Sequence, residues 1–151
     1  MSDPDLRTRP AGPGDHDRIM AVIDSWFGRP VAAKLPRMFL DHFGATSRVV
    51  ESADTRQLHA FLIGFLCPTH PDEGYIHFVG VDPARRGRRI AAGLYEEFFD
   101  LCRRDGRHVV RAVTPPVNTS SVAFHVALGF EVTRPDGDRD EPIRFTRTLA
   151  G

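Results

Sequence analysis

The segment from Tyr75 to Leu101 constrains the fold most, because three patterns follow one another in it without a gap. Residues 75–81 form an apolar run rich in β-branched and aromatic side chains, which predicts a strand. A turn containing Gly87 comes next, and apolar side chains then recur at helical spacing: Ile90, Leu94, Phe98 and Leu101. The segment therefore predicts a strand, a turn and the N-terminus of a helix, where free backbone N–H groups favour an anion.

Arginines give this turn a positive charge at any working pH: Arg85, Arg86, Arg88 and Arg89. We therefore expect a pyrophosphate site, with a solvated basic turn as the alternative. Two better-known phosphate loops are excluded. A Walker loop needs Lys and then Ser or Thr after its second glycine, and a dinucleotide fingerprint needs three spaced glycines. Residues 81–94 contain neither pattern.

Residues 81–91 resemble the acyl-CoA-binding motif of the GNAT superfamily of N-acetyltransferases. That motif is usually written Val-x-Pro-x-x-Arg/Gln-Gly-x-Gly-x-Gly/Ala, and the matching residues are Val81, Pro83, Arg86, Gly87 and Ala91. Arg89 departs from it, because the family mostly has glycine there. We expect the Arg89 side chain to point away from the phosphate, or the loop to open slightly.

A second stretch, Asn118 to Phe130, is similar to the superfamily's later motif, Asn-x-x-Ser/Ala-x-x-Phe/Leu-Tyr/His-x-x-x-Gly-Phe. The two motifs occur in the family's order. The resemblance implies an α/β (α+β) fold with a mixed, mostly antiparallel central sheet, flanked by helices and split between the fourth and fifth strands. It also implies acetyl-CoA as co-substrate, bound by Val79, Val81, Arg86, Gly87, Arg88, Arg89, Ile90, Ala91, Asn118 and Ser121.

Catalytic groups follow from the same resemblance. The family often has a carboxylate base on the strand before the loop, where this chain has Tyr75. His77 lies two residues on, hence on the same strand face, and its ordinary pKa suits amine deprotonation. Glu73, expected in a loop, is the other candidate base. His125 occupies the place of the family's proton-donating tyrosine, with Ser121 four residues before it. Hydrogen-bonded or packed structural roles are the alternatives for both histidines.

The segment from Ser25 to Pro30 is expected to be a loop carrying bulky apolar groups. It is interpreted either as a lid over the core or as the wall of an acceptor pocket made by Trp26, Phe27 and Arg29. A guanidinium beside aromatic rings would favour an amine that also carries an apolar part and a carboxylate.

Regular structure is expected as follows. Strands are predicted at residues 5–10, 47–52, 57–66, 75–81, 108–113, 130–133 and 142–148, and helices at 15–24, 36–42, 88–104 and 118–128. A bulge is expected at Gly64, and Pro115 and Pro116 should end the strand before them.

Composition limits the remaining classes. A chain of 151 residues is expected to form one domain, residues 1–151. Its 20 basic and 20 acidic side chains give no support to a nucleic-acid or membrane partner. No signal peptide or spanning segment is found, so a cytoplasmic protein is expected. The acidic and histidine residues around His70 fit no defined ligand spacing, so no metal is expected.

These patterns predict an N-acetyltransferase that moves an acetyl group from acetyl-CoA to a primary amine of a small molecule or peptide. A serine hydrolase is disfavoured, because Gly-x-Ser-x-Gly is absent. A non-catalytic acyl-CoA-binding module is the main alternative, since the family's tyrosine and carboxylate are missing. An arginine-rich nucleic-acid-binding domain is the other. A homodimer is left open.

Overall fold

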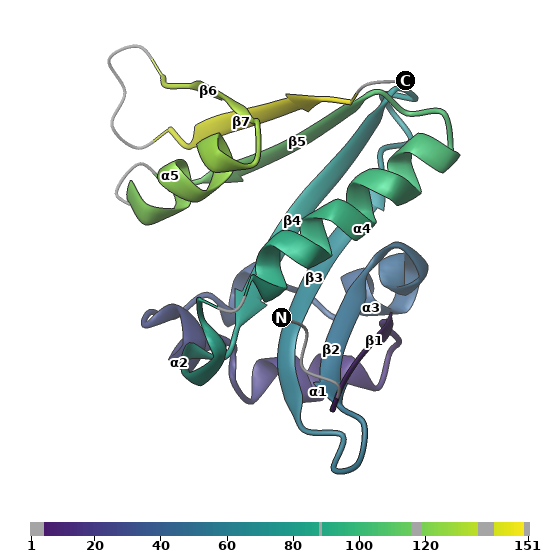
Figure 1. Ribbon diagram of the computed structural model, residues 1–151, viewed down its shortest axis with the longest axis vertical. Coiled ribbons are helices and arrows are strands. Elements are labelled where there is room, and N and C mark those ends of the chain that lie inside the picture. The colour runs from purple at the N-terminus through teal and green to yellow at the C-terminus, as the bar shows by residue number, and fades with distance from the viewer. Residues whose placement is uncertain (1–4, 88, 116–118, 136–140, 150–151) are drawn as a thin grey trace. The chain divides into compact units, whose positions relative to one another are not determined.

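The computed structural model describes residues 5–87, 89–115, 119–135 and 141–149 (Figure 1). These fall into two compact units. The first consists of Met1–Phe65 and Phe78–Phe98, and the second of Leu66–His77 and Phe99–Gly151. A single domain over residues 1–151 stays a prediction. No helix among the described residues is long and apolar enough to cross a membrane.

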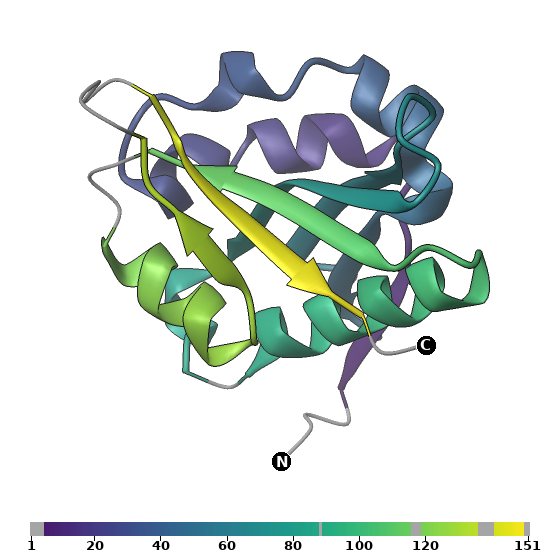
Figure 2. The same ribbon diagram turned by 90° about the horizontal axis from the view of Figure 1, so that it is seen from above.

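The first unit contains the N-terminal strands and helices. Its strands are β1 (Leu6–Pro10), β2 (Arg48–Ser52), β3 (Leu58–Leu66) and β4 (Glu73–Val81). Of β3 it contains the residues up to Phe65, and of β4 those from Phe78 onward. Its helices are α1 (Asp15–Met20), α2 (Ile23–Phe27), α3 (Met38–Phe43) and α4 (Ile90–Arg104, to Phe98), with 3₁₀ turns η1 (Ala32–Lys34), η2 (Gly44–Thr46) and η3 (Pro83–Arg85). The β1–β2 and β2–β3 pairs are antiparallel. Figure 2 shows α1–α3 and α4 on opposite faces of these strands.

Strand β3 is the most buried strand of this unit, and every residue from Leu58 to Gly64 is buried. One of its faces joins a core cluster with the α1–α3 region: Ile19, Ile23, Trp26, Val31, Leu35 and Leu40 pack with Phe61 and Ile63. A strand covered on both faces reads as a continuous apolar run, which the sequence of β3 does. The core therefore fixes where the neighbouring β4 runs.

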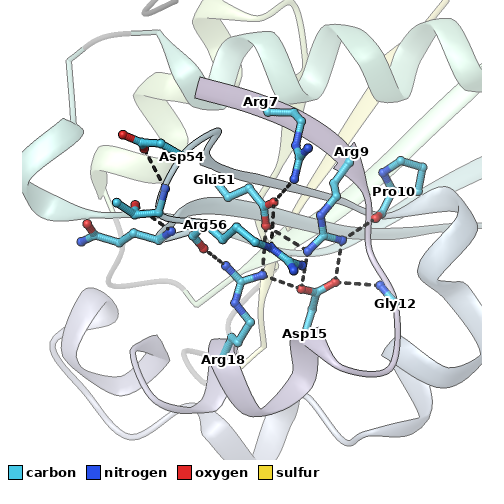
Figure 3. A network of polar contacts seen from close by, with 11 residues as sticks. Arg7, Arg9, Pro10, Gly12, Asp15, Arg18, Glu51, Asp54 and Arg56 are labelled. Atoms are coloured by element: carbon cyan, nitrogen blue, oxygen red, sulfur yellow. Dashed lines mark hydrogen bonds and ion pairs between the residues drawn. The ribbon is translucent and has the colours of Figure 1, made fainter. Parts of the chain in front are cut away.

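A charged cluster links β1, α1 and β2 (Figure 3). The Glu51 carboxylate is fully buried and accepts hydrogen bonds from Arg7, Arg9 and Arg18 at 2.6, 3.0 and 3.1 Å. Arg9 and Arg18 also donate to Asp15. Burial alone would raise the pKa of Glu51, but these hydrogen bonds outweigh it and lower the pKa from 4.5 to about 2. The cluster holds a charge inside the fold only because arginines surround it.

The second unit contains the start of β4 (to His77), the end of α4, β5 (Val109–Thr114), α5 (Thr119–Ala127), β6 (Glu131–Thr133) and β7 (Ile143–Thr148). β4 pairs with β5 in parallel, whereas β5–β7 and β6–β7 are antiparallel. The parallel register runs from Glu73 opposite Val109 to Tyr75 opposite Arg111. β5 stays paired with β7 as far as Thr114. This short register agrees with the split expected between the fourth and fifth strands.

The strand order β1-β2-β3-β4-β5-β7-β6 completes a mixed seven-stranded sheet, which confirms the expected fold class. Helix α5 ends as its sequence predicts: Gly129 has φ 89°, and the Phe130 N–H donates to the His125 carbonyl at 3.0 Å. The helix expected over residues 88–104 begins at Ile90 among the described residues.

Two local expectations were wrong. The first helix ends at Met20, and residues 25–27 are helical, not a loop. Ile19, Ile23 and Trp26 recur at helical spacing, so burial continues the helical structure as far as Gly28, whose φ of 71° ends α2.

The β2–β3 register shifts between Val50 and Glu51, and the bulge expected at Gly64 stays a prediction. Side chains contact the Gly64 backbone: its N–H donates to Ser47 Oγ, and its carbonyl accepts from Thr46 Oγ1.

The second correction concerns Glu73, which is the first residue of β4 and not part of the preceding loop.

Candidate active site

The loop after β4, residues 82–89, is called the basic loop, and Asp82 anchors its start. The Asp82 N–H donates to the His59 carbonyl of β3 at 2.8 Å. The Asp82 carboxylate accepts the Ala84 N–H at 3.0 Å, and the Asp82 carbonyl accepts the Arg85 N–H at 2.8 Å. These bonds close η3 and direct the chain towards α4. An Asp-Pro pair at this place is a typical helix-start signal.

Gly87 and Arg89 shape the second half of the basic loop. Gly87 has φ 85°, and a Cβ built on it would meet no atom within 4 Å. Arg89 has φ 61°, in the left-handed region. Helix α4 then begins, and the first bond from its first turn runs from the Gly93 N–H to the Arg89 carbonyl at 3.1 Å. Helix geometry leaves the N–H groups of Ile90 and Ala91 without a partner inside the helix. Open space beside such N–H groups suits an anion.

Arg86 turns towards α2. Its Nη2 donates to the Trp26 carbonyl at 2.5 Å. Trp26 is only 8% exposed and stacks on Phe61 with ring centroids 6.0 Å apart. Phe27 is half-buried and meets Phe78 of β4 edge to face at 5.3 Å. Trp26 is thus part of the core, as the lid interpretation expects, while Phe27 keeps some exposed surface.

Gly80 of β4 gives these rings their space. A Cβ at Gly80 would lie 2.6 Å from one ring atom of Phe61 and 3.2 Å from a ring atom of Phe27. Any larger residue would therefore displace the aromatic groups that support α2. This close approach explains the glycine in the middle of an otherwise apolar strand.

Both candidate bases lie on one face of β4 with Tyr75 between them: Glu73, Tyr75 and His77 are all partly exposed, whereas the intervening Gly74 and Ile76 are buried. The Glu73 carboxylate accepts a hydrogen bond from Arg111 Nε at 2.7 Å. Burial raises the pKa of Tyr75, so its hydroxyl stays protonated near neutral pH. The Glu73 carboxylate is thus already engaged by an arginine within the fold.

His125 is a buried residue on α5, 6% exposed. Its ring stacks on Phe145 with centroids 4.0 Å apart and an interplanar angle of 1°. Nδ1 lies 2.7 Å from the Ser121 carbonyl oxygen, which can only accept, so Nδ1 donates the proton. Burial lowers the pKa of His125, and the hydrogen bond to Ser121 offsets part of the effect. The ring is therefore neutral near pH 7.

A family model described as "Acetyltransferase (GNAT) family" matches residues 17–130, three quarters of the chain. The chain belongs to the GNAT family. Similar proteins include an L-2,4-diaminobutyric acid acetyltransferase of Nocardia farcinica, 31% identical over 53% of this chain and 41% of that protein. Another is an L-methionine sulfoximine/L-methionine sulfone acetyltransferase of Salmonella typhimurium, 39% identical over 38% of this chain and 33% of the relative. The chain thus spans less than half the length of either relative.

Solved structures agree on the fold. The crystal structure of Ard1 from Thermoplasma volcanium superimposes with a TM-score of 0.79 at 18% identity, covering 97% of this chain and 99% of that one. An identity this low supports the GNAT fold alone.

The family comparison explains Arg89. Where GNAT motifs mostly have glycine, this chain has a side chain at φ 61°, a conformation that costs an L-residue about 1–2 kcal/mol. Arg89 therefore adopts a backbone conformation that a glycine would adopt without strain. Arg88 and Asn118, also predicted to bind acetyl-CoA, lie outside the described residues.

Sequence reasoning did not find two features of the first unit. One is the Arg86–Trp26 contact, which joins residues sixty positions apart. The other is a chain of polar groups behind the basic loop: Ser52 Oγ lies 2.6 Å from His59 Nε2, and His59 Nδ1 lies 3.9 Å from the Asp82 carboxylate. Both depend on long-range packing, and only the Asp-Pro pair left a local signal. The described residues contain no group of three side chains able to hold a metal ion.

Proposed function

We propose that this GNAT protein is an acetyl-CoA-dependent N-acetyltransferase that acetylates a primary amine. The basic loop supports this most directly. Its Gly87 has open space where a side chain would project, and it leads into the N-terminus of α4. A pyrophosphate fits such a site, because backbone N–H groups and the positive end of the helix dipole face it.

Acetyl-CoA supplies the activated acetyl thioester. The residues proposed to hold its pyrophosphate are Gly87, Arg88, Arg89, Ile90 and Ala91. The backbone at Val79 and Val81 is proposed to pair with the pantetheine arm, as an added strand would. Asn118 and Ser121 stay candidates for contacts with the same arm.

The proposed reaction is a direct attack. The neutral amine attacks the thioester carbonyl, the C–S bond breaks, the nitrogen loses a proton and the thiolate takes one up. Correct positioning alone can account for about 7–11 kcal/mol of the barrier, so no covalent enzyme intermediate is needed. His77 is our preferred base, because Glu73 is paired with Arg111. A partly exposed strand histidine can pass a proton to water.

An amino-acid-like amine is the proposed acceptor. The two relatives named above act, by their names, on amino acids or their close analogues. Arg29 follows α2 and is half-buried, where a guanidinium could pair with a substrate carboxylate. Phe27 offers an apolar surface beside it. A peptide amine is the second acceptor class to test.

A CoA-binding module without catalysis is the competing proposal. Two observations favour it: the Glu73 carboxylate is engaged by Arg111, and the His125 ring is buried against Phe145. Release of free CoA thiol that depends on an added amine separates the two proposals.

Acetyl-CoA is expected to raise the melting temperature of the protein. A ligand at 100 times its dissociation constant contributes about 2.7 kcal/mol to the free energy of unfolding. For a chain of this size that corresponds to about 5–10 °C. Differential scanning fluorimetry measures the shift, with NAD and ATP as controls that should give little change. An unchanged melting temperature at millimolar acetyl-CoA would refute the proposed donor.

His125→Phe distinguishes the two roles of this residue. The buried, neutral ring favours packing, so we expect kcat to stay within a few-fold and the melting temperature to fall. Loss of a general acid would instead lower kcat by about 10²–10⁴-fold. Steady-state rates with acetyl-CoA at saturation decide between them. A fall of that size, with unchanged acetyl-CoA affinity, would restore His125 as the proton donor.

A further inference from the structure

The Arg86 side chain joins the basic loop to the end of α2. Its guanidinium donates to the Trp26 carbonyl at 2.5 Å, one residue before the end of that helix. The carbonyl groups of a last helical turn have no partners inside the helix and carry partial negative charge. A guanidinium there makes a charge-assisted hydrogen bond, which is stronger than a neutral one. Arg86 therefore fixes the C-terminus of α2 against the basic loop.

The segment that follows α2 is itself well held. The Asp24 carboxylate accepts the N–H groups of Val31 and Ala32 at 2.8 and 2.9 Å. The Arg29 N–H donates to the Asp24 carbonyl at 3.2 Å. Asp24 thus ties the two ends of residues 24–32 together. A displacement of the α2 C-terminus would carry Phe27 and Arg29 with it.

We propose that Arg86 is a positioning residue that couples occupancy of the basic loop to the α2 segment. The inference rests on the proposed function, since it takes the basic loop as the acetyl-CoA site and Phe27 and Arg29 as acceptor contacts. Binding of the pyrophosphate fixes the loop and hence Arg86, and Arg86 fixes the end of α2. The ordering cost is then already met when the amine arrives, so the amine binds more tightly to the acetyl-CoA complex.

The chain has one tryptophan, Trp26, and its carbonyl is the group that Arg86 contacts. Its indole ring, which stacks on Phe61, therefore reports by its fluorescence on any shift of this part of α2. Titration with CoA, excited where only tryptophan absorbs, should change the emission of the native protein. Arg86→Met removes both the charge and the donors, whereas Arg86→Lys keeps a charged donor of similar reach. Arg85→Met is the matched control, because it removes the same charge from the adjacent position.

In Arg86→Met saturated with CoA, we expect most of the emission change to disappear. Arg86→Lys should retain at least half of it, and Arg85→Met, whatever its CoA affinity, should show the full native emission change once it is saturated with CoA. The KM for L-2,4-diaminobutyrate, used as the probe amine, should rise about fivefold or more in Arg86→Met, with kcat within twofold. CoA affinity is measured separately by calorimetry, so that each spectrum is taken at saturation. If Arg86→Met binds no CoA, the coupling is tested by Arg86→Lys alone: retention of at least half of the emission change supports it, and loss of the change contradicts it.

Two results would overturn the coupling: a native protein that binds CoA without any change at Trp26, or an Arg86→Met variant with the full native change. Failure of the native protein to bind CoA in the calorimeter would instead refute the proposed function. The two failures are thus distinguishable.

Discussion

Replacing Glu51 by glutamine is expected to lower the free energy of unfolding by about 3 kcal/mol. The substitution keeps the size of the side chain but removes a fully buried charge that Arg7, Arg9 and Arg18 contact. Breaking a buried ion pair by removing one partner typically costs about 3–5 kcal/mol. We expect the lower end, because the Arg7 side chain is 51% exposed and can regain water. The melting temperature should fall by about 6–12 °C.

Glu97→Gln is the matched control for this prediction. Glu97 pairs with Arg48 at 3.4 Å and its side chain is 48% exposed, so its loss should cost less than about 1 kcal/mol. Urea titration of the three proteins measures the difference. Equal midpoints for native protein and Glu51→Gln would show that the cluster in Figure 3 contributes no net stability.

The same cluster predicts a pH dependence. The pKa of Glu51 is lowered from 4.5 to about 2 in the folded protein, so its stabilising contribution is complete above pH 4.5. It is lost as the pH falls from 4.5 towards 2, because the unfolded chain takes up the proton first. In Glu51→Gln, stability should fall less steeply over this range. Parallel pH profiles would contradict the assignment.

Gly87→Glu is expected to reduce acetyl-CoA affinity at least a hundredfold. The phosphate oxygens are proposed to lie in the open space around Gly87, and the variant would put a carboxylate there. Two like charges about 4 Å apart near a protein surface repel by about 4 kcal/mol, and each 1.4 kcal/mol is a factor of ten in affinity. Isothermal calorimetry with acetyl-CoA measures the loss.

Two controls separate charge from backbone strain. Gly87→Ala adds a Cβ at φ 85° without a charge, so it should cost far less affinity than the glutamate. Gly106→Glu makes the same change at φ 76°, likewise with no atom within 4 Å, in the turn after α4. It should lower the melting temperature but leave acetyl-CoA affinity unchanged. If Gly106→Glu weakens acetyl-CoA binding as much as Gly87→Glu, the pyrophosphate site lies elsewhere.

Sequence alone predicted most of this fold, because its strands and helices have strong local signals. β3 is a continuous apolar run, and α4 repeats its apolar residues at helical spacing. The helix predicted over residues 118–128 likewise ends within one residue of the end of α5 at Ala127. Prediction from neighbouring residues was wrong where packing between distant segments determines the local structure. Burial of Trp26 on Phe61 continues α2 past Asp24, and the irregular register at Glu51 occurs where four arginines surround its carboxylate.

The candidate site shows the same division. The motif gave the basic loop and its glycine, since both are encoded in consecutive residues. It could not give the role of Arg86, whose partner is a backbone carbonyl sixty positions away. Nor could it show that Arg111 engages Glu73 or that Phe145 stacks on His125, because these contacts join separate strands and helices. The residue types suggested catalytic roles for Glu73 and His125, and the contacts of these two side chains weaken that interpretation.

Amine-dependent release of free CoA thiol tests the central claim most directly. The native protein is incubated with acetyl-CoA and a panel containing L-2,4-diaminobutyrate, L-methionine sulfoximine, L-methionine sulfone and short peptides, with Gly87→Glu as the matched control. We expect thiol release with at least one amine, little without amine, and an equal amount of product heavier by one acetyl group. Acetyl-CoA binding without thiol release from any amine in the panel would contradict the proposed transferase and support a CoA-binding module.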